Sequence, residues 1–191
     1  MATSLFEILQ QRRGRVLFVS EKNSSRSQMA EAYARVLGED VIEAASGGAS
    51  PAPSIPHQTH AVMREKGVSL AADQSPKNFH SLTLQDFDVI VNLGGCRLPE
   101  TEATVLELPL PAPVDDLPSH REVRERIETF VNFLVDHFRR AKEWNHGVEQ
   151  ASSAMPGSVK PSSVKQDSAQ TSPVPTPAAT PQPDAAMTAA S

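Results

Sequence analysis

The sequence predicts an α/β domain: a doubly wound, four-stranded parallel sheet in three layers, with helices on both faces. Short apolar runs typical of buried strands alternate with segments in which apolar residues recur at helical spacing. Strands that alternate with helices favour a parallel sheet covered on both faces. Ligands of such sheets bind beyond the carboxyl ends of the strands, so we expect the functional residues in the loops that follow strands.

In the first half of the chain, two strand and helix pairs are predicted. Residues 16–19 are consecutive apolar residues and predict a buried strand, and the helical spacing that follows ends at Gly38. Residues 41–46 predict the second strand. A helix over 54–66 follows, after a stretch rich in glycine and proline.

In the second half, residues 87–93 and 103–108 predict the third and fourth strands, and a proline-rich loop spans 109–118. The last helix has the clearest pattern of the chain. Its apolar stripe comprises Val123, Ile127, Phe130, Val131, Leu134, Phe138 and Ala141.

The domain itself is predicted over residues 14–143. Residues 1–13 carry four apolar residues on one side of a short helical pattern, which favours an arm packed on the outside of the domain over a partner-binding or membrane-surface helix. Residues 144–191 are rich in Ala, Ser, Thr and Pro, and contain seven prolines from Asn145 onward. Such a segment cannot bury enough apolar surface to order itself, so it predicts a disordered tail.

Composition narrows the classes of function. A net charge of −5 argues against nonspecific nucleic-acid binding, and the single cysteine suits a reducing compartment. No apolar run approaches membrane-spanning length, so no membrane contact and a cytoplasmic location are expected. No cofactor or metal is predicted either: His57 and His60 are three residues apart, but no cysteine or carboxylate cluster accompanies them. The oligomeric state is left open.

The loop from Ser20 to Arg26 joins the first strand to the first helix. Such a loop directs backbone N–H groups and the positive end of the helix dipole at one point, which favours an anion. The guanidinium of Arg26 adds a planar fork suited to oxyanions. The residues by themselves are equally compatible with an ordinary connection that carries a surface arginine.

Residues 15–32, RVLFVSEKNSSRSQMAEA, resemble the phosphate-binding loop of low-molecular-weight protein tyrosine phosphatases and of the related thioredoxin-coupled arsenate reductases. The resemblance implies that Ser20 occupies the position of the nucleophilic cysteine and that Arg26 holds the oxyanion. Gln28 resembles the arsenate-reductase branch. The implied ligand is phosphate, arsenate or a phosphorylated protein or small molecule, bound by Glu21, Lys22, Asn23, Ser24, Ser25, Arg26 and Ser27.

Three departures from the family pattern bear on catalysis. A serine hydroxyl gains too little from a helix N-terminus and an arginine to ionise, so Ser20 predicts loss of covalent chemistry. Lys22 stands where the family usually has glycine, which predicts backbone strain if that residue needs a positive φ. Glu21 places a negative charge near the mouth of an anion site.

The general acid of the family is an aspartate before a proline, in the loop that precedes the last helix. Pro111-Ala112-Pro113 resembles that segment with alanine in the aspartate position. Asp115 and Asp116 offer a rival alignment, in which Asp116 is the candidate acid. Cys96 is displaced from the position of the family's resolving cysteine, near Gly94, and without a second thiol in the chain it cannot complete a disulfide relay.

The resemblance therefore implies a family member that is catalytically degenerate and retains at most an oxyanion-binding loop. Two alternatives stay open. One is an active phosphatase or arsenate reductase with a non-standard nucleophile, and the other is an interaction domain whose pocket binds nothing.

Overall fold

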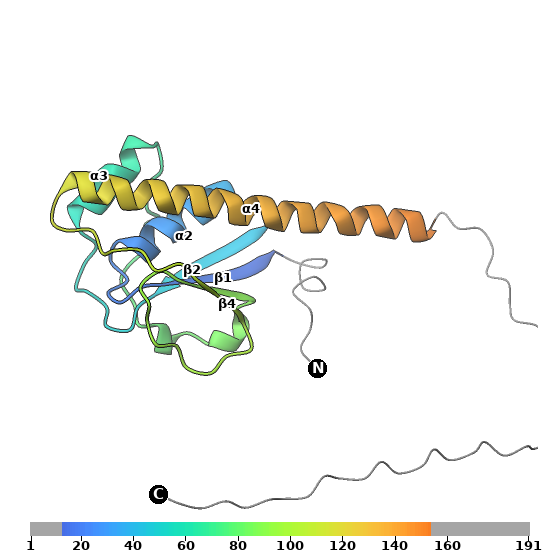
Figure 1. Cartoon of the computed structure of the whole chain (residues 1–191), viewed down its shortest axis with the longest axis horizontal. Coiled ribbons are helices and arrows are strands. Elements are labelled where there is room, and N and C mark those ends of the chain that lie inside the picture. The colour runs from blue at the N-terminus through green and yellow to red at the C-terminus, as the bar shows by residue number, and fades with distance from the viewer. Residues whose placement is uncertain (1–12, 154–191) are drawn as a thin grey trace, which may run out of the picture. The chain divides into compact units, whose positions relative to one another are not determined.

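The computed structural model describes residues 13–153 and confirms the predicted α/β fold (Figure 1). One sheet contains β1 (Gly14–Val19), β2 (Ile42–Gly47), β3 (Val89–Asn92) and β4 (Thr104–Glu107), in the order β2-β1-β3-β4. All three neighbouring pairs are parallel. Val19, the last residue of β1, is in register with Gly47 of β2 and Asn92 of β3. The loop after β1 therefore starts at the centre of the carboxyl edge of the sheet.

One face of the sheet is covered by α2 (Arg26–Leu37), α3 (His57–Glu65) and α4 (Leu117–Ser153). Val16 and Phe18 of β1 point to this face and join its core. The apolar stripe predicted for the last helix supplies much of the rest: Val123, Ile127, Val131, Leu134 and Phe138 are all buried. Burial of this stripe holds α4 to the sheet, because the apolar area removed from water stabilises the packed state.

The opposite face is covered by two short 3-10 helices, η1 (Phe79–Ser81) and η2 (Leu84–Asp86), and by their loops. Leu17 and Val19 of β1 point to this side and pack in the same cluster as Phe79 and Leu84. Alternate residues of β1 thus enter opposite cores, and all of 16–19 are fully buried. A strand buried on both faces needs apolar residues at every position, which is the run seen in the sequence.

Helix α4 continues to Ser153, so the domain boundary predicted at residue 143 falls inside it. No proline follows Pro118 until Pro156, so no residue in between removes a helical hydrogen bond. Residues 1–12 and 154–191, which include most of the predicted arm and tail, lie outside the described residues. Among the helices that are described, none is long and apolar enough to cross a membrane.

Candidate functional site

The loop over residues 20–25 is fixed by backbone hydrogen bonds to the segment that follows β2. Ser20 N donates to the Gly47 carbonyl at 3.2 Å, and the Glu21 carbonyl accepts from Ser50 N at 2.8 Å. The Lys22 carbonyl accepts from Ala52 N at 2.9 Å. Since these bonds occupy carbonyl groups of the loop, its conformation is set by the neighbouring chain as well as by its own sequence.

Two glycines allow other segments to approach the loop closely. A Cβ at Gly48 would lie 2.8 Å from Asn23 N and from the Glu21 carbonyl. A Cβ at Gly94, at the end of β3, would lie 2.9 Å from Glu21 N. Side chains at either position would force the loop to move. The sequence pattern alone did not predict this role for either glycine.

Asn23 is the one non-glycine residue with positive φ in the described chain, at 44°. Sequence reasoning expected that conformation at Lys22, so the predicted strain at Lys22 is wrong. Asparagine tolerates the left-handed region better than other side chains do. The side-chain amide of Asn23 also holds the residue in this conformation. Its Nδ2 donates to Ser27 Oγ at 2.9 Å and to Ser46 Oγ at 2.8 Å, and its Oδ1 accepts from Lys77 N at 2.8 Å.

A buried carboxylate stands behind this network. Ser46 Oγ donates to Glu31 Oε2 at 2.6 Å, and Glu31 is fully buried. Arg35 Nη2 lies 2.6 Å from Glu31 Oε1 and compensates its charge. Because Ser46 gives its only hydrogen to Glu31, its oxygen is left to accept from Asn23. The chain of bonds from α2 through β2 thus fixes the orientation of the Asn23 amide.

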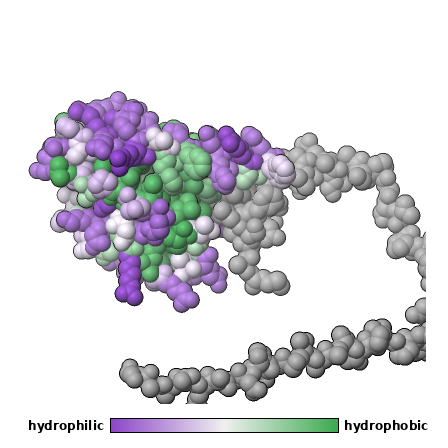
Figure 2. Space-filling view, in the orientation of Figure 1, coloured by the Kyte–Doolittle hydropathy of each residue, from purple (hydrophilic) through white to green (hydrophobic). Residues whose placement is uncertain are grey.

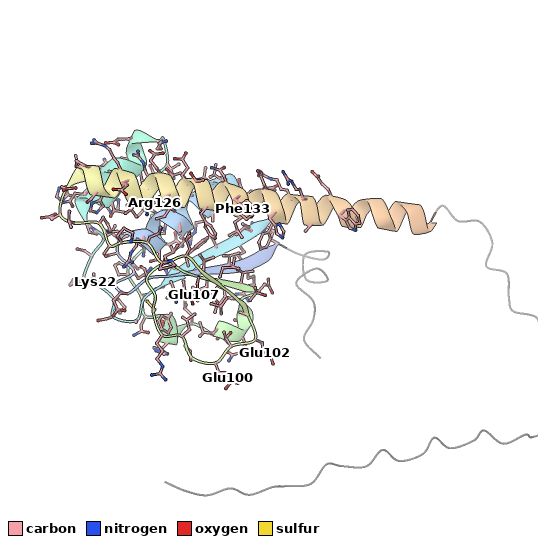
Figure 3. All side chains as sticks on the ribbon, viewed as in Figure 1. Lys22, Glu100, Glu102, Glu107, Arg126 and Phe133 are labelled. Carbon is pink, nitrogen blue, oxygen red and sulfur yellow. The ribbon has the colours of Figure 1, made fainter. Side chains whose placement is uncertain are left out.

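The loop opens into a pocket of about 430 Å³. Five of the seven residues predicted to bind a ligand line it, together with Ser20 from the predicted nucleophile position: Glu21, Lys22, Ser24, Ser25 and Arg26. The other two, Asn23 and Ser27, are fully buried and support the loop. Figure 3 shows Lys22 at the end of the molecule where α4 begins, and residues from that start also line the pocket.

Ser20 lies at the end of β1 and is 2 % exposed. Its hydroxyl is hydrogen bonded to Ser27 Oγ at 2.7 Å. A second hydroxyl can share a proton with Ser20 but cannot remove one as a base at neutral pH, so this contact does not activate Ser20 as a nucleophile.

The Arg26 side chain is held at one of its terminal nitrogens. Nη1 donates to the Leu110 carbonyl at 2.7 Å and to the Leu93 carbonyl at 3.1 Å. Among the described residues, none accepts a hydrogen bond from its Nε or Nη2. Burial lowers the pKa of this guanidinium, while Cys96 and Glu21 raise it. Arginine stays charged in proteins, so Arg26 presents a positioned cation with two nitrogens available to a ligand.

The segment before α4 contributes Ala112 and Asp115 to the pocket, and Asp116 is not among its lining residues. Asp116 instead accepts a hydrogen bond from Ser119 N at 2.7 Å, which caps the first turn of α4. The structure therefore gives Asp116 a capping role, and its assignment as the candidate acid stays a prediction. Asp115 Oδ1 accepts from Gln58 Nε2 of α3.

Two further residues, His120 and Cys96, lie at the site. His120, in the first turn of α4, lines the pocket and is 3 % exposed, although no sequence signal pointed to it. Cys96 lies against the loop, with its thiol directed at Glu21 Oε2 at 3.7 Å. Burial and the neighbouring Glu21 carboxylate raise the pKa of Cys96, so the thiol is protonated at neutral pH and a poor nucleophile.

Comparison with known proteins supports the family that residues 15–32 resemble. Residues 15–101 match the family described as low molecular weight phosphotyrosine protein phosphatase. The glutaredoxin arsenate reductase of Synechocystis sp. is 37% identical over 84 residues, which are 43% of this chain and 61% of that protein. The match thus spans less than two thirds of that relative. A putative arsenate reductase of Halobacterium salinarum is 31% identical over 130 residues, which are 63% of this chain and 90% of that one.

Solved structures agree with the sequence matches. The arsenate reductase of Archaeoglobus fulgidus aligns with a TM-score of 0.57 and 29% identity, covering 63% of this chain and 98% of that one. An arsenate reductase in the phosphate binding state aligns with a TM-score of 0.59 and 28% identity, covering 65% of this chain and 98% of that one. The chain therefore belongs to the family of low-molecular-weight phosphotyrosine protein phosphatases and arsenate reductases.

Proposed function

We propose that this protein binds a tetrahedral oxyanion of the phosphate or arsenate class in the pocket of the 20–26 loop, and that it no longer catalyses the chemistry of its family. The ligand is free phosphate or arsenate, or a phosphoryl group on a protein or small molecule. The observation that carries the proposal is Arg26, fixed through Nη1 and left with two unpaired nitrogens beside the loop.

Helix ends add to the attraction for an anion. The pocket is lined by residues at the starts of three helices: Ser25 and Arg26 at α2, Pro56 at α3 and His120 at α4. Neither α2 nor α3 has a side chain that caps its first turn. Their first backbone N–H groups therefore lack side-chain acceptors and carry the positive end of the helix dipole, which favours bound anions.

The loss of catalysis is inferred from two positions. Ser20 stands where the family has its cysteine, and a hydroxyl ionises far less readily than a thiol in the same field. Ala112 lines the pocket where the resemblance implies the general acid, and a methyl group cannot protonate a leaving group. An oxyanion could then be held by Arg26 and the amides without being cleaved.

The names of the relatives fit this class of ligand. The similar structures include arsenate reductases, one of them in a phosphate binding state. Arsenate and phosphate share charge and tetrahedral shape, so one cradle of N–H donors suits both.

A second candidate is turnover of a phosphorylated substrate, and one observation favours it: the carboxyl group of Asp115 lies in the pocket. In that case Asp115 would serve as the acid and Ser20 would have to act as the nucleophile. The same experiment separates the two candidates.

The test uses the full chain, with binding of phosphate, arsenate and vanadate measured by calorimetry and by the rise in melting temperature. Arg26→Ala should weaken binding about tenfold or more, because it removes a charged donor of the oxyanion. Arg64→Ala is the matched control, since Arg64 is exposed at the end of α3, where its Nε donates to the His60 carbonyl.

Hydrolysis of p-nitrophenyl phosphate is measured on the same samples. Binding without turnover, lost in Arg26→Ala and kept in Arg64→Ala, supports the proposal. Turnover that Arg26→Ala abolishes would favour the enzyme instead. If no oxyanion binds to the folded protein, the pocket has no such function and the interaction domain is favoured.

A further inference from the structure

His120 is buried in the first turn of α4, and only one of its two ring nitrogens has a partner. Nδ1 lies 2.7 Å from the Asp116 carbonyl oxygen. A carbonyl can only accept, so Nδ1 carries the hydrogen and donates it. In the neutral ring, Nε2 therefore holds the lone pair, and protonation of His120 places a second N–H there.

Nε2 of His120 has no hydrogen-bond partner among the described residues, and it is enclosed. Three other buried side-chain atoms share that condition: Arg15 Nε, Glu31 Oε1 and Arg124 Nε. Each of these three belongs to a side chain that is ion-paired. His120 forms no ion pair among the described residues, so its Nε2 is the one of the four that belongs to a side chain without an ion pair. Native proteins rarely leave a buried polar atom unpaired unless a water, ion or ligand completes it.

The surroundings of His120 indicate what completes it. His120 lines the same pocket as Ser20 and Arg26, and it comes from α4, whereas Ser20 and Arg26 belong to the 20–26 loop. From α3 the neighbours are uncharged: Pro56 lines the pocket, and Gln58 bonds to Asp115. The charged residues that line the pocket with His120 are Glu21, Lys22 and Arg26, from the loop and α2, and Asp115, from the segment before α4. Asp116 does not line the pocket but interacts electrostatically with His120.

We propose that His120 is a further binding residue of the oxyanion pocket: a small movement of the ring exposes Nε2, and the imidazolium Nε2–H then donates a hydrogen bond to the bound anion. This inference rests on the proposed function. It adds that binding takes up a proton, so that affinity rises as the pH falls through the titration of a histidine. Carboxyl groups as a class titrate well below that range, and the hydrogen bonds from Ser119 lower the pKa of Asp116 further, so the acidic neighbours do not produce the same dependence.

Sulfate is the probe of choice, because it stays a dianion over the whole range, whereas phosphate changes its own charge there. Affinity is measured by calorimetry with the full chain between about pH 5.5 and 8, the range in which a histidine titrates. For the unmodified protein we expect binding about tenfold tighter at the acidic end, the gain typical of one added charged hydrogen bond.

Two substitutions separate the ring nitrogens. His120→Asn keeps a donor near the Nδ1 position for the Asp116 carbonyl but has nothing at Nε2, so its affinity should be low and independent of pH. His120→Gln places a neutral N–H donor near the Nε2 position, so its affinity should be intermediate and independent of pH. His57→Asn is the matched control, because His57 begins α3 but is exposed and does not line the pocket.

The outcomes are distinguishable. If the sulfate affinities of His120→Asn and His120→Gln do not change with pH, while the affinity of His57→Asn still rises as the pH falls, the inference is supported. If either His120 variant that folds, as judged by circular dichroism, keeps the full rise in affinity, His120 does not contact the anion. If the unmodified protein binds sulfate equally at all pH values and Arg26→Ala abolishes binding, the inference fails and the proposed function stands. If nothing binds at any pH, the proposed function itself fails.

Discussion

At the scale of single residues, the proposed loss of catalysis rests chiefly on Ser20. The loop, Arg26 and the start of α2 are arranged as an anion site requires, yet the group that would attack is a hydroxyl bonded to Ser27 Oγ. A field that ionises a thiol near neutral pH leaves an alcohol protonated. The same pocket can therefore keep affinity for an oxyanion while losing the ability to form a covalent intermediate.

We predict that Ser20→Cys produces a reactive thiolate. The substitution is made in a Cys96→Ser background, so that the new thiol is alone. Its pKa should lie below the usual 8.5 or so, because the α2 N-terminus and Arg26 stabilise the anion. Alkylation rates as a function of pH give the pKa directly. Unmodified Cys96, whose pKa is raised by burial and by Glu21, is the slow reference.

Turnover should need the acid as well. Adding Ala112→Asp to Ser20→Cys should raise hydrolysis of p-nitrophenyl phosphate by about 10²- to 10⁴-fold, the usual contribution of a general acid. The control is Val114→Asp, a nearby position that also lines the pocket. A double variant that still binds vanadate but hydrolyses nothing would contradict the view that these two groups alone are missing.

At the scale of elements, the start of α4 is fixed by Asp116. Its carboxylate accepts from Ser119 N, and this hydrogen bond lowers the pKa of Asp116, with a smaller contribution from His120. The backbone carbonyl of the same residue accepts a hydrogen bond from His120 Nδ1. The cap thus fixes both the helix start and the ring that faces the pocket.

We predict that Asp116→Ala lowers the melting temperature at pH 7 by about 4 °C, as expected for loss of one helix cap in a domain of this size. Because the folded-state pKa is depressed, the stabilisation is present above the unfolded value of about 3.9 and is lost as the pH falls through the folded value. The difference between the two proteins should therefore shrink below about pH 4. Asp136→Ala, exposed on the same helix, should show neither effect.

At the scale of the whole molecule, the described domain has a continuous core on each face of the sheet and one exposed apolar region. Figure 2 shows apolar residues gathered where α4 lies beside the β4 edge, over a groove lined by Leu108, Pro109, Leu110, Phe130 and Phe133. Phe133 is 69 % exposed. Within the described residues, the helices and the sheet bury one another in these two cores.

We predict that truncation after residue 153 leaves the melting temperature and the affinity for phosphate unchanged. Residues 154–191 have the composition of chains that cannot bury a core, so their removal should cost no packing. Differential scanning calorimetry of the two lengths checks this. A clear fall in melting temperature would mean that the C-terminal residues contribute to the fold. Ile127→Ala, which opens a cavity beneath α4, is the positive control and should cost about 2–5 kcal/mol.

The sequence was enough to predict the four parallel strands, the last helix and the loop that joins β1 to α2. Residues 16–19 are apolar at every position because β1 is buried on both faces, and the apolar stripe on α4 repeats with the period of a helix. Such local patterns can be recognised from the sequence alone. The positive φ expected at Lys22 occurs one residue later, at Asn23. The position of this turn depends on hydrogen bonds between Asn23 and the distant residues Ser46 and Lys77, and also Ser27.

The sequence by itself determined the family, the position of Ser20 and the fork of Arg26, because these lie within one short run of the chain. Only the tertiary structure shows which residues outside the 20–26 loop line the pocket. It brought Ala112, Asp115 and His120 across from the loop and left Asp116 as a cap. These residues are about a hundred positions from Ser20 in sequence, and they meet it only because parallel strands bring the loops at their carboxyl ends to one edge of the sheet.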